Sequence, residues 1–135
     1  MQNTMWELGD QDSKSNDAAF DSEENRRLSR WTHIEILRPL FHAATKRLRI
    51  AETAALNEDL YLAYLQLRQA KRLFEELQSH LATIDKELSS RFTAVISYLD
   101  CCMRDVDHDR IGFARDLLLR RRDIITEIIE SAMPD

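Results

Sequence analysis

Apolar side chains recur every three or four residues along most of this chain, from about residue 33 to about residue 131. This spacing sets them along one face of an α-helix, whereas a half-buried strand would alternate apolar and polar residues. The pattern predicts four helices, over about 33–56, 60–81, 86–105 and 110–131. Their predicted core faces are Ile34, Leu37, Phe41, Ala44, Leu48, Ala51 and Ala55; Leu60, Ala63, Leu67, Ala70, Phe74, Leu77 and Leu81; Leu88, Phe92, Val95, Leu99, Cys102 and Val106; and Ala114, Leu117, Leu118, Ile124, Ile125, Ile128 and Ile129.

A capping signal marks the predicted start of the first helix. Thr32 can serve as the N-cap, with Glu35 as its reciprocal partner in a capping box, and Trp31 and Ile36 can form a hydrophobic staple. Pro39 lies inside the same helix, where it removes one backbone donor and crowds the preceding turn. We therefore expect a kink or a short break at Pro39.

Short polar segments separate the predicted helices. In the first of them, Asn57 can adopt a left-handed conformation and Asp59 can cap the helix that follows. Residues 83–85 interrupt the second stripe, and residues 107–109 supply a cap for the last helix. Short connections favour consecutive helices that pack side by side in opposite directions. The predicted fold class is all-α, an antiparallel up-down-up-down four-helix bundle over residues 31–135.

The N-terminal segment differs from the rest in charge and pattern. Residues 1–25 carry seven acidic residues against Lys14 alone, and they show no apolar periodicity. Such a segment buries too little apolar surface to offset the entropy of ordering it. We predict that residues 1–30 are acidic and largely disordered or loosely docked, and Trp6 and Phe20 are the aromatic residues in it that could dock on a groove.

Charge, hydropathy and cysteine content exclude several classes of function. The formal net charge is −5, and residues 26–135 are nearly neutral with 17 acidic and 18 basic residues, so nucleic acid is not an expected partner. No window approaches the roughly 18 apolar residues of a membrane span, and we predict a cytoplasmic protein without membrane insertion. Cys101 and Cys102 are adjacent on a predicted helix and project about 100° apart, so we expect reduced, buried thiols.

The candidates for chemistry are sparse. The four histidines, His33, His42, His80 and His108, fall on different predicted elements, and the Glu-x-x-His spacing of helical metal sites is absent. His42 lies one turn before Lys46, an arrangement that a phosphotransfer bundle could use, but a boundary histidine explains it as well. We find no glycine-rich phosphate loop. The prediction is therefore no enzyme, with no catalytic residues, no metal site and no cofactor.

The chain has more apolar residues than one core stripe per helix requires. A wide core face can accommodate such residues, and a second apolar face that contacts another polypeptide is the alternative. The second interpretation predicts a client-binding surface formed by Leu40, Ile50, Leu62, Leu65, Ile96, Tyr98, Met103, Ile124 and Ile129.

Several short motifs follow one another in a recognisable order over about 70% of the chain, from Ile34 to Ile129. They are Leu37, Leu40-Phe41 and Ala51 in the first helix; Asn57-Glu58-Asp59 before the second; Ala70, Phe74, Leu77 and Leu81 within it; Val95-Ile96-Ser97-Tyr98 in the third; and Asp107-His108-Asp109 before the last. This order resembles that of the bacterial flagellar secretion chaperones that hold flagellin. The chain departs from the family at Ile96, where a tyrosine is usual, and at Cys102-Met103, where an Arg-Leu pair is usual, so it resembles a divergent member.

The resemblance implies a helical chaperone that binds the C-terminal segment of flagellin, or a similar amphipathic client, in the cytosol and prevents its premature polymerisation before export. It also implies that the N-terminal segment can occupy the empty client groove. An export-gate component and a second copy of the chain, in a weak homodimer, are further candidate partners. Another helical adaptor and a self-associating structural bundle without a client are the alternative functions.

Overall fold

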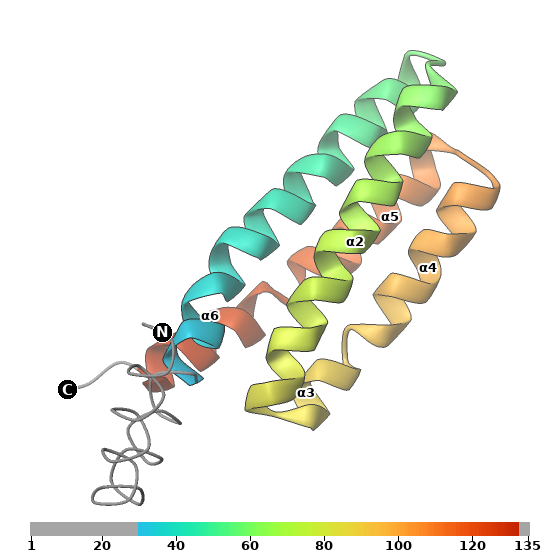
Figure 1. The fold of residues 1–135 in the computed structure, drawn as a ribbon. Coiled ribbons are helices and arrows are strands. Elements are labelled where there is room, and N and C mark those ends of the chain that lie inside the picture. The colour runs from blue at the N-terminus through green and yellow to red at the C-terminus, as the bar shows by residue number, and fades with distance from the viewer. Residues whose placement is uncertain (1–29, 133–135) are drawn as a thin grey trace, which may run out of the picture. The chain divides into compact units, whose positions relative to one another are not determined.

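The computed structural model describes residues 30–132, and the chain divides into two compact units, Met1–Thr32 and His33–Asp135. In the first unit residues 30–32 are helical, and the expectation for the rest of the N-terminal segment falls outside the described residues. Apart from the short connections, the described part of the second unit is helical and contains no strand, which confirms the all-α class (Figure 1). The described helices are the first helix at residues 30–56, α2 at Leu60–Ile84, α3 at Lys86–Ser90, α4 at Thr93–Arg104, α5 at His108–Leu119 and α6 at Arg122–Ala132.

The first helix begins earlier than the local signals predict. Because residues 30–32 are already helical, Thr32 is not an N-cap and the predicted start at residue 33 is wrong. The helix is also unbroken at Pro39. Pro39 leaves the carbonyl of Glu35 without its helical donor, but both residues are exposed, so water can hydrate that carbonyl.

Three aspartates cap the helices that follow the turns. The side chains of Asp59, Asp85 and Asp107 each accept a hydrogen bond from a backbone N–H in the first turn of α2, α3 and α5. The cap at Asp59 was predicted from the sequence, and the cap at Asp107 lies within residues 107–109, where the sequence predicted one. The left-handed residue in the first connection is Glu58, with φ 64°, and not Asn57 as predicted.

The third and fourth predicted helices are each interrupted in the middle. The first interruption separates α3 from α4 at residues 91–92, and the second separates α5 from α6 at residues 120–121. Tertiary hydrogen bonds occupy the carbonyls at the first interruption: Gln78 Nε2 donates to the Ser89 carbonyl at 2.9 Å, and Arg121 Nε donates to the Arg91 carbonyl at 2.8 Å. The predictions of continuous helices at 86–105 and 110–131 are therefore wrong.

The core follows the predicted stripes closely. Every residue of the four predicted core faces is buried or half-buried except Leu60, which is exposed. Ala54 and Ile111 are buried although they were not assigned to a stripe. Thr45 is one of two buried polar residues among residues 30–132, and its hydroxyl donates to the Phe41 carbonyl at 2.7 Å, so no buried donor is left unpaired at this position.

The register between α2 and α4 explains why Leu60 is exposed. Lys71 Nζ lies 2.7 Å from Asp100 Oδ1, and Gln78 Nε2 donates to Thr93 Oγ1 at 2.8 Å, so later residues of α2 contact earlier residues of α4. Continued at this register, the end of α4 lies beside Leu67, and the first two turns of α2 have no α4 neighbour. Figure 1 shows the connection before α2 extending past the α4–α5 connection.

Candidate docking surface

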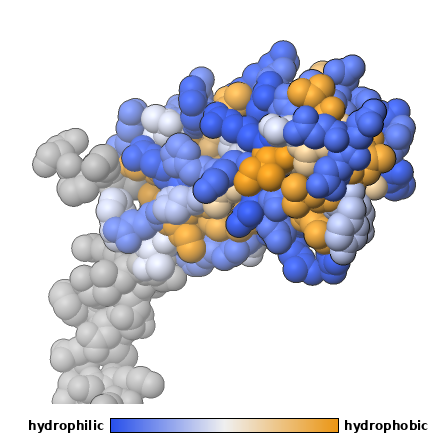
Figure 2. All heavy atoms as spheres, turned by 90° about the horizontal axis from the view of Figure 1, so that it is seen from above, coloured by the Kyte–Doolittle hydropathy of each residue, from blue (hydrophilic) through white to orange (hydrophobic). Residues whose placement is uncertain are grey.

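The exposed large apolar residues of the described chain gather in one place. Five of the six lie within residues 56–64, at the end of the first helix and the start of α2, with exposed fractions between 38% and 75%. We call them the hairpin-end patch: Leu56, Leu60, Tyr61, Leu62 and Tyr64. Figure 2 looks onto the face that lies uppermost in Figure 1 and shows hydrophobic side chains gathered among hydrophilic ones.

The patch exists because the first residues of α2 are themselves apolar on every side of the helix. Leu60 to Leu65 are six consecutive apolar residues, so no polar face remains in the first two turns of this helix. A helix segment that is apolar on all sides is normally buried. Here α4 ends before reaching it, so the side chains that a longer α4 would cover are exposed to solvent.

An open hollow of about 370 Å³ lies beside the patch, between the first helix and α2. Its lining includes the large apolar residues Ile50 and Leu62 and the charged residues Arg49 and Asp59. Thr53, Ala54 and Asn57 complete it. The hollow gives the patch a concave side, and a recess of this kind can receive one apolar side chain of a partner.

The structure places the nine sequence-predicted client-binding residues in three regions. Leu40 is only 7% exposed and belongs to the core, so it is not available to a client in this structure. Leu62 is exposed, and Ile50 and Leu65 are half-buried near it. The other half-buried residues are Ile96, Tyr98 and Met103 on α4 and Ile124 and Ile129 on α6, away from the patch in the sequence.

The sequence prediction missed four of the five patch residues. Leu60 was predicted to belong to the core, and Leu56, Tyr61 and Tyr64 were not predicted to belong to a binding surface. The uninterrupted apolar run at the start of α2 was the signal that could have identified them, because periodicity does not explain it.

A smaller aromatic contact joins α4 to α5. The rings of Tyr98 and Phe113 lie edge to face with their centroids 5.2 Å apart, and Phe113 is exposed. Desolvation raises the pKa of the Tyr98 phenol, in keeping with its partly covered position. This pair is the second place in the described chain where a large apolar side chain is exposed.

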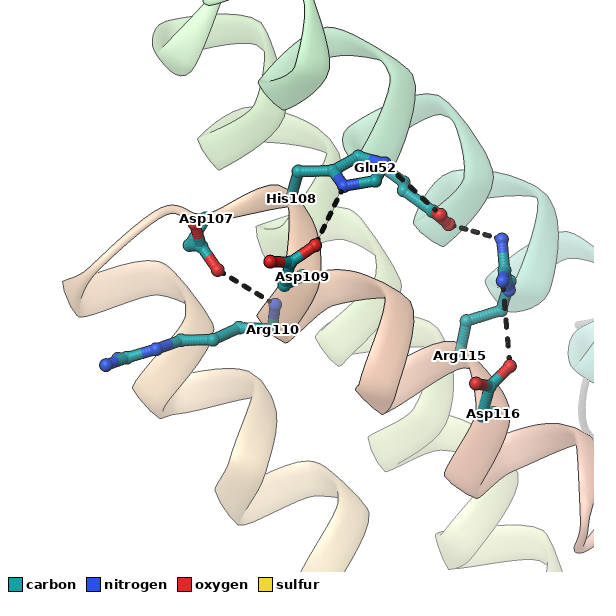
Figure 3. Close-up of polar contacts among 7 residues, drawn as sticks. All are labelled: Glu52, Asp107, His108, Asp109, Arg110, Arg115 and Asp116. Carbon is teal, nitrogen blue, oxygen red and sulfur yellow. Dashed lines mark hydrogen bonds and ion pairs between the residues drawn. The ribbon is translucent and has the colours of Figure 1, made fainter.

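A polar cluster connects the first helix to α5 (Figure 3). One carboxylate oxygen of Glu52 accepts from Arg115 Nη1, and the other lies 3.6 Å from His108 Nε2. Arg115 also lies 3.6 Å from Asp116, and His108 lies 3.3 Å from Asp109. Because both oxygens of Glu52 contact residues of α5, the cluster holds the first helix and α5 together.

The histidines meet in a way that the sequence does not indicate. His33 of the first helix and His80 of α2 face each other with their Nδ1 atoms 2.6 Å apart, and Glu76 lies 3.9 Å from His80 Nε2. His42 is exposed on the first helix. Among residues 30–132 no group of three or more histidine, cysteine or acidic side chains is arranged to hold a metal ion.

Both cysteines have free thiols in the structure. Cys102 is fully buried, and burial raises the pKa of its thiol to about 11. A thiol with this pKa is protonated at neutral pH and a weak nucleophile. Cys101 is half-buried, and its sulfur accepts from Arg104 Nη2 at 3.1 Å.

No helix in the described part of the chain has the length and apolarity needed to cross a membrane. Comparisons of the chain with protein-family models, with curated proteins and with solved structures found no match.

Proposed function

We propose that this protein is a non-catalytic chaperone that holds an amphipathic segment of another protein on the hairpin-end patch. The observation that carries the proposal is the concentration of five exposed large apolar residues within residues 56–64. Exposed apolar side chains scattered singly are common on monomeric proteins, whereas five large ones within nine residues favour an interaction site. Tyr61 and Tyr64 strengthen the case, because tyrosine is enriched among the residues that dominate binding energy.

The proposed platform is an antiparallel up-down-up-down four-helix bundle in which α3 with α4, and α5 with α6, form the interrupted third and fourth members. Three contact pairs support this arrangement. His33 contacts His80 and Arg47 contacts Gln66, so the first helix and α2 pair with opposite chain directions. Glu52 near the end of the first helix contacts His108 at the start of α5.

A client segment would bind as a helix in a groove. An amphipathic helix presents apolar residues at i, i+3, i+4 and i+7, and it could place one of them in the hollow beside Leu62 while others cover Tyr61 and Tyr64. The resemblance of the chain to flagellar secretion chaperones makes the C-terminal segment of flagellin the client to test first, in the cytosol. An export-gate component is a further proposed partner.

Titration of the full chain with a fluorescently labelled flagellin C-terminal peptide tests the proposal. We expect micromolar or tighter binding, at least ten-fold weakened by Leu62→Asp, because burying the new carboxylate in the hollow carries a large desolvation cost. Ser79→Asp is the matched control, since it adds the same group to an exposed position near the other end of α2. The proposal fails if the peptide does not bind, or if both variants bind it as the wild type does.

Self-association is the alternative that the same patch allows, because a second copy could cover it. Sedimentation velocity at several protein concentrations separates the two functions. A concentration-dependent dimer that Leu62→Asp dissociates, together with no peptide binding, would identify the patch as a homodimer interface.

A further inference from the structure

Exposed basic residues adjoin the patch on both helices, before it on the first helix and after it on α2. On the first helix an exposed stripe at spacings of three and four residues passes through Arg38, His42, Lys46 and Arg49 before it reaches Leu56. On α2 the exposed stripe passes from Tyr61 and Tyr64 to Arg68 and Arg72. Between residues 36 and 51, and between residues 60 and 74, the chain contains no acidic residue. We call the five exposed cations the cationic band: Arg38, Lys46, Arg49, Arg68 and Arg72.

The two stripes lie on neighbouring helices at matching heights. Arg47 Nη1 donates to Gln66 Oε1 at 3.2 Å, which sets the register of the first helix against α2. At this register Lys46 lies near the level of Arg68, and Arg49 near the level of Tyr64. Arg49 also lines the hollow that contains Leu62. The apolar patch and the cationic band are therefore parts of one continuous surface.

The cationic band is not neutralised within the described chain. None of its five members forms an ion pair or a hydrogen bond with another side chain among residues 30–132. Other cations of the second unit do have acidic partners, such as Lys71 with Asp100 and Arg110 with Asp105. Five uncompensated charges of one sign beside an apolar surface produce a local positive potential, although the chain as a whole is negative.

We infer that the partner segment held by the patch is acidic, with carboxylates one to two helical turns from its apolar anchors. This inference rests on the proposed function and specifies the chemistry of its client. The distance from Tyr61 to Arg72 along α2 is about 17 Å at 1.5 Å per residue, so an amphipathic helix of roughly 12–18 residues spans both regions. Its apolar residues cover the patch, and its carboxylates pair with the guanidinium and ammonium groups of the band.

A nucleic acid fits this surface less well than an acidic protein does. Residues 26–135 are close to neutral, so the net field does not attract a phosphate backbone. Acidic residues also border the band at both ends, with Glu58 and Asp59 in the turn and Glu75 and Glu76 on α2. An extended polyanion carries charge along its whole length and would meet these carboxylates, whereas an amphipathic helix can place apolar residues beside Asp59 and its carboxylates beside the band.

The test uses the full chain and two designed peptides of about 18 residues with identical apolar anchors at i, i+3, i+4 and i+7. One peptide carries Glu and Asp one to two turns beyond the anchors, and the other carries Gln and Asn at those positions. We expect the acidic peptide to bind at least ten-fold more tightly at low ionic strength, and added salt to reduce this difference.

The variant that reports on the band is Lys46→Glu with Arg68→Glu, which reverses one cation on each helix at about the same level and leaves the lining of the hollow unchanged. We expect it to bind the acidic peptide at least ten-fold more weakly and the neutral peptide almost unchanged. Lys86→Glu with Arg122→Glu is the matched control: it changes the net charge equally, at exposed first positions of α3 and α6 where a glutamate favours the helix. Circular dichroism confirms that all variants keep their helicity.

The outcomes separate the inference from the proposed function. If both peptides bind equally, Leu62→Asp weakens both, and the charge reversals have no effect, the inference is wrong and the proposed function stands. If neither peptide binds, both fail. The inference is also overturned if a single-stranded RNA binds and displaces the acidic peptide, or if the charge reversal dissolves a dimer of the chain.

Discussion

Replacing Glu52 with glutamine tests whether the polar cluster of Figure 3 fixes the first helix against α5. The Glu52 side chain is 15% exposed and that of Arg115 is 31% exposed, so their ion pair lies between two well-characterised cases. Exposed pairs contribute about 0–1 kcal/mol, and removal of one partner from a buried pair costs about 3–5 kcal/mol. We expect a loss of about 2 kcal/mol, because Arg115 keeps a contact with Asp116 and access to water.

Urea unfolding followed by circular dichroism measures this loss, and for a domain of about 100 residues it corresponds to a melting temperature lower by roughly 8 °C. Asp105→Asn is the matched control, since it breaks the more exposed pair with Arg110 and should cost less than about 1 kcal/mol. Combining Glu52→Gln with Arg115→Gln completes a double-mutant cycle. A coupling energy near zero would refute the reasoning, because it would show that the two side chains do not stabilise each other.

Two further changes have a predictable sign. Gly112 has a negative φ within α5, and a methyl group there would lie 3.5 Å from Glu52 Oε1, an ordinary van der Waals distance. Gly112→Ala should therefore stabilise the protein by about 0.5–1 kcal/mol in urea unfolding. A loss of stability would mean that α5 packs too closely on Glu52 to accept the methyl group. Burial raises the pKa of Cys102 from 9.0 to about 11, so above pH 9.0 the unfolded chain loses this proton before the folded chain does. The stability that the protonated thiol contributes is complete below pH 9.0 and is lost as the pH rises to about 11, by up to roughly 2 kcal/mol. Unfolding of the wild type and of Cys102→Ala at about pH 8 and about pH 10.5 checks this, and an equal fall in both proteins would contradict it.

Local patterns in the sequence determine the class of the fold and most of its core. The spacing of Leu37, Phe41 and Leu48 on the first helix, and of Leu67, Phe74 and Leu81 on α2, predicts which side chains are buried, and all six are buried. A helix places residues three and four positions apart on one face whatever it packs against. The Asp59 cap could be predicted for the same reason, because it acts on a backbone N–H three residues away.

The interruptions and the candidate docking surface depend on residues that are distant in the sequence. The break before α4 involves Gln78 and Arg121, which reach carbonyls eleven and thirty residues away. The exposure of Leu60 depends on where α4 ends relative to α2, and the hollow beside Leu62 depends on how the first helix and α2 align. Periodicity reports that a residue lies on an apolar face, but only the lengths and register of the neighbouring helices decide whether another element covers it.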